Sequence, residues 1–136
     1  MIDNYGRFEG RLITEWDDDG RTMVLVEPFR YVDPKGMFWD CPAGYRTDGA
    51  SIPKLLWSFA GGPFSGRYRK AAIPHDVFCD NRVRPWEDTH QMFWHAMLCA
   101  GVGEHNAALM YRAVYNHGPR WDAAGKDLVH EYPEEW

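Results

Sequence analysis

The sequence lacks three features that would each assign a broad class of protein. No window approaches 18 consecutive apolar residues, which excludes a membrane-spanning helix. Only three cysteines are present, Cys41, Cys79 and Cys99, and this small odd number excludes a disulfide framework and favours a reducing compartment. Basic residues are fewer than acidic ones, with 15 lysines and arginines against 20 aspartates and glutamates. The net charge of −5 argues against bulk electrostatic binding of nucleic acid.

What is present suits one globular domain. The 136 residues are 45% hydrophobic and 15% aromatic, with seven tryptophans, and a chain of this size buries about two-thirds of its unfolded surface. Residues 1–6 contain neither a basic nor an apolar segment, so we expect no secretory signal peptide.

The first third of the chain predicts β-structure. Turn sequences at residues 17–20 and 33–36 separate three segments of strand composition, which begin with residues 7–16, 21–27 and 37–41. Pro28 closes the second strand, and residues 29–32 continue it after a bend. We expect a three-stranded antiparallel meander, which needs helices on one face because so small a sheet is not stable alone.

Three helical segments are expected after the strands, over residues 68–82, 85–100 and 104–117. Pro74 leaves two alternatives for the first: a kink at that position, or a helix that begins near Ile73. The predicted fold class is α+β, a small N-terminal antiparallel β-meander packed against a C-terminal three-helix region. The single domain 1–136 would contain a β part (1–46), a loop-rich hinge with a short helix (47–67), a helical part (68–118) and a polar tail (119–136).

The His75-Asp76 pair is the main candidate for chemistry. Adjacent residues on a helix diverge by about 100°, so the two side chains would act on different partners. Asp88, in the first turn of the next helix, is the candidate that orients the His75 ring. Asp48 is the candidate carboxylate in a cleft between sheet and helices. The alternative is structural, because acids in turns and first helical turns stabilise the backbone without any function.

Two groups near this pair are candidates for binding. Glycine-rich loops let backbone carbonyls approach an ion, so Gly61 and Gly62 could hold calcium together with Asp76. The candidate substrate-binding residues are a small basic cluster and a hydroxyl: Arg67, Arg69, Lys70 and Ser51. Most such basic clusters are simply solvated, and Ser51 is also placed to cap a short helix.

A zinc site is a further hypothesis. His75 and Cys79 are four residues apart, as are His95 and Cys99, so each pair lies on one helix face. Two facing helices could assemble a site of two histidines and two cysteines. The alternative is that the stripe of Asp88, Met92, His95 and Cys99 is a core face.

Several sequence blocks resemble one family. Residues 45–53 (YRTDGASIP), residues 71–76 (AAIPHD), Asp88 with Phe93, and Met110-Tyr111 resemble small proteins encoded by bacteriophages and prophages, the domain of unknown function 1353. The resemblance covers about residues 40–120. It implies a phage or prophage origin, residence in the bacterial host cytoplasm or in the virion, and partners among phage or host proteins. It implies no particular activity.

The order of a glycine-bearing loop, a His-Asp pair and a later Asp is also similar to the layout of secretory phospholipases. That resemblance implies that His75 is a general base for water, that Asp76 binds calcium with loop carbonyls, and that Asp88 orients His75. Membrane lipid would be the substrate. The chain departs from those enzymes because it has no disulfide framework and carries Pro74 directly before His75.

We therefore expect a calcium-assisted ester hydrolase, with zinc as the second choice of metal and no nucleotide cofactor. Two non-catalytic alternatives stay open. One is a component of a phage tail, tip or connector. The other is a host-takeover protein that binds and inhibits a bacterial target.

Overall fold

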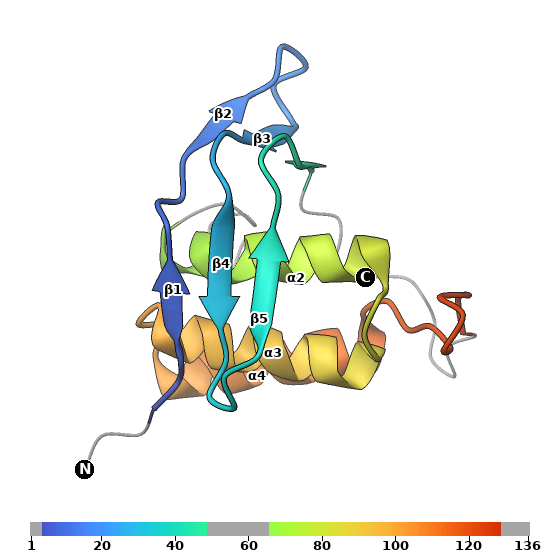
Figure 1. Cartoon of the computed structure of the whole chain (residues 1–136). Coiled ribbons are helices and arrows are strands. Elements are labelled where there is room, and N and C mark those ends of the chain that lie inside the picture. The colour runs from blue at the N-terminus through green and yellow to red at the C-terminus, as the bar shows by residue number, and fades with distance from the viewer. Residues whose placement is uncertain (1–3, 49–65, 129–136) are drawn as a thin grey trace.

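Strands in the first third of the chain and helices in the remainder give the protein an α+β fold (Figure 1). The computed structural model describes residues 4–48 and 66–128. The strands are β1 (Arg7–Glu9), β2 (Thr14–Trp16), β3 (Met23–Leu25), β4 (Phe29–Val32), β5 (Phe38–Cys41) and β6 (Arg46–Thr47). A short 3-10 helix, η2 (Gly66–Tyr68), leads into α2 (Arg69–Asn81), α3 (Trp86–Cys99) and α4 (Glu104–His117). The predicted α+β class is confirmed. Within these residues no helix has the length and apolar character needed to cross a bilayer.

The strands form two antiparallel sheets, of order β1-β4-β5 and β2-β3-β6, and not one meander. The expected strand over 7–16 is interrupted at Gly10, which has a φ of +88°. The second strand ends before Pro28, as expected for a residue with no N–H to donate to a neighbouring strand, but residues 29–32 form β4 of the other sheet and do not continue that strand. A Cβ at Gly10 would lie 2.9 Å from the Pro28 carbonyl oxygen, so the two breaks face each other. The chain passes between the sheets at this point.

The helices pack against one sheet and against each other. Helix α2 contacts β5 and α3, and α3 in turn contacts β1 and α4. In Figure 1 the β1-β4-β5 sheet crosses in front of α2 and α3. Strand β4 shows the alternation that this packing requires, since Phe29 and Tyr31 are buried whereas Arg30 is half-buried and pairs with Asp40. The main core therefore lies between this sheet and the helices.

Helix α2 runs through Pro74 without ending there. It begins at Arg69, so the alternative of a helix start near Ile73 is wrong. Pro74 lacks the N–H that would bond one turn back, but every residue from 71 to 79 is buried. Burial of this segment outweighs the lost hydrogen bond. Asp76 consequently lies in the middle of the helix, where the stabilisation of a first turn does not explain it.

The segment after α4 is packed for part of its length and is not simply a polar tail. Trp121 is 3% exposed, and its Nε1 donates to the Arg84 carbonyl at 2.8 Å. The Arg82 guanidinium donates to the Gly125 carbonyl at 2.9 Å and pairs with Asp127. Residues 119–128 therefore cover the ends of α2 and α3 that meet near Arg82, while 129–136 lie outside the described residues.

We predict that Trp121→Ala lowers the free energy of unfolding by about 3–5 kcal/mol, the usual cost of removing a buried tryptophan. Trp16→Ala is the matched control, because Trp16 is 59% exposed and its loss should change stability by no more than about 0.5 kcal/mol. Urea denaturation followed by circular dichroism measures both. Equal stability of the two variants would show that residues 119–128 do not pack as described.

Candidate functional site

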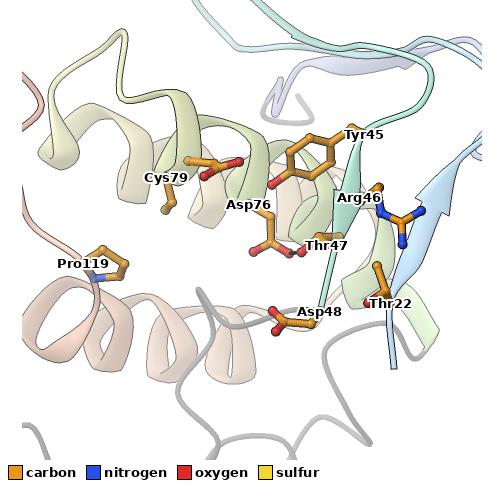
Figure 2. A pocket seen from close by; sticks show the side chains of 9 residues that line it. Thr22, Tyr45, Arg46, Thr47, Asp48, Asp76, Cys79 and Pro119 are labelled. Carbon is orange, nitrogen blue, oxygen red and sulfur yellow. Dashed lines mark hydrogen bonds between the residues drawn. The ribbon is translucent and has the colours of Figure 1, made fainter. Parts of the chain in front are cut away.

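A pocket of about 450 Å³ opens between the middle of α2 and the end of β6 (Figure 2). Three of its wall residues, Asp76, Cys79 and Asp80, come from α2. On the opposite side the wall includes Tyr45, Thr47 and Asp48. The pocket therefore brings together three carboxyl groups from two distant parts of the chain.

Asp76 is the buried carboxyl group of this pocket. The residue is 4% exposed, and the Thr47 hydroxyl donates to its Oδ2 at 2.6 Å. Figure 2 shows the Asp76 side chain pointing toward Asp48. The other oxygen, Oδ1, is buried and has no hydrogen-bond partner among the described residues. A buried acceptor without a partner costs about 1–3 kcal/mol, so Asp76 carries an uncompensated penalty.

The electrostatic surroundings of Asp76 are unfavourable to its charge. Burial raises the pKa of this carboxyl from 3.8 to about 7, against the hydrogen bond from Thr47, which lowers it. The exposed carboxyl groups of Asp48 and Asp80 contribute to this rise in pKa. Arg46 also lines the pocket, but its guanidinium pairs with Asp17. The pocket thus concentrates negative charge and suits a cation.

His75 lies beneath the pocket wall and is fully buried. Its Nε2 is 2.8 Å from Nδ1 of His90, whose Nε2 is 2.8 Å from the Pro119 carbonyl oxygen. A carbonyl oxygen only accepts, so His90 donates from Nε2, accepts at Nδ1, and receives its hydrogen bond from His75. Burial, with the neighbouring His90, lowers the pKa of His75 well below 6.5, so the ring is neutral.

The predicted pair of His75 and Asp88 does not form. Asp88 is exposed and lines a different pocket, of about 220 Å³, together with Arg84 and His95. His90 and Asp88 diverge by about 200° around α3, so when the side chain of His90 points toward α2 that of Asp88 points away from it. The residue of α3 that contacts Nε2 of His75 is therefore His90 and not Asp88.

The four residues of the predicted zinc site are only partly brought together. Cys79 Sγ lies 3.4 Å from His75 Nε2, on the same face of α2. His95 lines the other pocket, and Cys99 donates to the Gly6 carbonyl with a sulfur-to-oxygen distance of 3.4 Å. His90 takes the place that the sequence assigned to His95 and Cys99.

The remaining predicted residues divide into three groups. Asp48 lies in the pocket wall. The predicted substrate-binding side chains do not line the pocket: Arg67 lies in η2, and Arg69 and Lys70 lie at the start of α2. Arg67 donates to the Gly101 carbonyl at 3.0 Å. Three predicted residues lie outside the described part of the chain: Ser51, Gly61 and Gly62.

Three site residues were missed by the sequence reasoning: His90, Tyr45 and Asp80. A signal for His90 exists, because it precedes Phe93 by three residues and Met97 by seven, and these two side chains are buried on α3. Tyr45 shares its parity with Thr47, so both side chains point to the same side of the chain as it enters β6. Burial raises the pKa of Tyr45, so its hydroxyl stays protonated and can donate in the pocket.

The raised pKa of Asp76 predicts an unusual pH dependence of stability in the presence of a chelator. The folded state keeps the proton up to about pH 7 whereas the unfolded state loses it near 3.8, so the free energy of unfolding falls as pH rises through this window. At about 1.4 kcal/mol per pKa unit, the full penalty is roughly 4–5 kcal/mol. Asp76→Asn should remove this component, which urea titrations at pH 5 and 7.5 measure. An equal pH dependence in both proteins would contradict the assignment.

The variant Thr47→Val tests the direction in which the Thr47 hydrogen bond shifts the pKa of Asp76. It removes the hydrogen bond that lowers the pKa of Asp76, so the loss of stability should continue to a higher pH than in the unchanged protein. A window shifted to lower pH would contradict this role of Thr47.

Comparison with known proteins places the chain in a family. Its relatives include two proteins of Sinorhizobium fredii (strain NBRC 101917 / NGR234) described as uncharacterized. The chain is 45% identical to y4jT over 106 residues, which is 77% of this chain and 32% of y4jT. It is 41% identical to y4iH over 119 residues, which is 82% of this chain and 50% of y4iH.

The matched region thus spans between one third and one half of the length of these curated relatives. No solved structure is significantly similar to the chain. The family described as "Protein of unknown function (DUF1353)" matches residues 23–114, which include both walls of the pocket, β6 and α2. The matched segment is more than half of the sequence, and the chain therefore belongs to the DUF1353 family.

Proposed function

We propose that the protein is a metal-assisted hydrolase of ester bonds, with its reaction in the pocket of Asp48, Asp76 and Asp80. The observation that carries the proposal is the buried Oδ1 of Asp76, which lines the pocket and has no hydrogen-bond partner among the described residues. Buried carboxylates are normally paired with a cation or bind a metal. A hard divalent cation would supply the missing charge.

Calcium fits the atoms that this pocket offers. It takes six to eight oxygen ligands, mostly from carboxylates, carbonyls and water, in a flexible geometry. Asp76 provides an oxygen at the base of the pocket, while the exposed Asp48 and Asp80 provide carboxylates at its rim. When bound, the ion would act as a Lewis acid that polarises the ester carbonyl.

The other pocket residues have roles that ester hydrolysis requires. The Tyr45 hydroxyl would donate to the carbonyl oxygen as negative charge develops on it. The Asp48 carboxylate would accept the proton of the attacking water and pass it to the leaving alcohol. His75 is a positioning residue in this scheme, because it does not line the pocket and instead links α2 to His90 of α3.

Calcium titration calorimetry and ester hydrolysis test the proposal together. The substrates are a chromogenic carboxylic ester and phospholipid vesicles, each with calcium or with a chelator. We expect the unchanged protein to bind one calcium ion and to hydrolyse an ester only when calcium is present. Asp76→Asn should lose the ion and at least about 100-fold in rate, the usual cost of losing a key electrostatic group.

Asp88→Asn is the matched control, because it makes the same chemical change at an exposed carboxylate outside the pocket. It should bind calcium and turn over substrate as the unchanged protein does. Equal losses in Asp76→Asn and Asp88→Asn would contradict the pocket assignment. Calcium binding without turnover of either substrate would overturn the hydrolase and leave a cation-binding protein.

A second candidate function is non-catalytic protein binding, as a phage particle component or as an inhibitor of a host protein. The observation in its favour is the exposed side chain of Trp16 on β2, which is an edge strand of the β2-β3-β6 sheet. Light scattering of the unchanged protein beside Trp16→Asp tests it. Self-association that the variant loses would support a phage particle component. If both proteins are monomers, the particle component is contradicted.

A phage or prophage origin belongs to the same proposal. It is supported by the resemblance of the TDGASIP and HD blocks to phage-encoded proteins. Neighbouring genes for phage capsid, tail or lysis proteins would support this origin, and a purely metabolic neighbourhood would contradict it.

A further inference from the structure

The proposed hydrolysis does not use a buried cluster of His75, Cys79 and His90, of which only Cys79 lines the acidic pocket. His75 and Cys79 lie four residues apart on α2, and His90 reaches them from α3. The two imidazoles are fully buried and Cys79 is almost so. One nitrogen of each histidine and the sulfur of Cys79 all lie within 4.8 Å of one another. Three side chains of metal-ligating type thus converge from two helices on one point.

We propose that His75, Cys79 and His90 form a zinc site, distinct from the carboxylates of the pocket, that binds one ion through two imidazole nitrogens and one thiolate. The donor set points to zinc, because nitrogen and sulfur ligands suit this borderline-soft ion and do not suit calcium. Three protein ligands also leave a fourth position for water or substrate, as in many zinc sites.

The two distances from His75 Nε2 to the other ligand atoms are close to those that zinc requires. With zinc-to-nitrogen bonds of about 2.0–2.1 Å and zinc-to-sulfur bonds of about 2.3 Å, ligand atoms of a tetrahedral site lie about 3.3–3.6 Å apart. The separation of Cys79 Sγ and His75 Nε2 is 3.4 Å. The separation of His75 Nε2 and His90 Nδ1 is 2.8 Å, so these nitrogens must move apart by roughly 0.5 Å to admit the ion.

The orientation of His90 is already that of a metal ligand. Its Nε2 donates to the Pro119 carbonyl at 2.8 Å, which leaves the lone pair of Nδ1 directed at His75. Histidines that bind metals usually donate their other ring N–H to a carbonyl or carboxylate in this way, and the partner fixes both tautomer and ring orientation. Binding would require His75 to carry its ring proton on Nδ1 instead of Nε2, so that Nε2 can ligate the ion, and would release the Cys79 thiol proton to solvent.

Cobalt(II) is a suitable probe because its absorption spectrum reports both thiolate ligation and tetrahedral geometry. The full chain, treated with a chelator and kept reduced, is titrated with cobalt and then with zinc, and native mass spectrometry counts the ions. We expect one cobalt per chain, a sulfur-to-cobalt charge-transfer band, and its loss when zinc displaces the cobalt. Cys79→Ser should lose the band and weaken binding at least about 100-fold, since even the partners of ligands contribute about 10–100-fold.

Two control variants make the assignment specific. Cys99→Ser changes the cysteine of the alternative ligand set and should leave the spectrum unchanged, because Cys99 contacts the Gly6 carbonyl and not the cluster. Asp76→Asn should lose calcium but keep the cobalt spectrum, so failure of the hydrolase proposal and failure of this one are distinguishable.

Three results would overturn the zinc site: no bound cobalt or zinc in the unchanged protein, a full charge-transfer band in folded Cys79→Ser, or a band lost only in Cys99→Ser. If Cys79→Ser does not fold, cadmium-113 NMR of the unchanged protein decides. A single resonance in the range for one sulfur and two nitrogen ligands supports the site, and a shift typical of oxygen ligands contradicts it.

Discussion

The burial of the middle of α2 is the constraint on which the rest of the structure depends. Every residue from 71 to 79 is buried. These residues include Pro74, which removes a backbone hydrogen bond, and Asp76, whose charge is desolvated. Both are costs that the apolar contacts of the helix with β5 and α3 must offset. A helix so enclosed cannot leave polar side chains to solvent, so each polar side chain in its middle needs a partner inside the protein or a bound ion.

Helix α2 meets this requirement in two chemically different ways. Toward β6 it presents Asp76 and the exposed Asp80, which with Asp48 form an oxygen-rich pocket. Toward α3 it presents His75, whose partners are nitrogen and sulfur. Hard cations prefer the first environment and borderline-soft metals the second. One helix therefore separates two kinds of ligand chemistry, and this separation underlies the two proposals made for the protein.

His90 connects these features to the chain after α4. Its ring bridges His75 and the Pro119 carbonyl, so α2, α3 and the segment that follows α4 meet at one hydrogen-bonded line. Trp121 packs near the same ring, with its centroid 6.2 Å away. The order of the site thus depends on a segment that the sequence presents as a polar tail.

The sequence by itself determined the fold class, the three helices to within one residue at most ends, and the prominence of His75, Asp76 and Asp48. These follow from local signals, namely hydrophobic periodicity, glycine and proline positions, and unusual polar residues in apolar segments. Only the tertiary structure decided that two sheets replace one meander and that His90, not Asp88, meets His75. The reason is that the sequence gives the rotation of a helix or the continuity of a strand only approximately, and a small difference places a side chain on another face. Long-range packing alone selects the face that is buried.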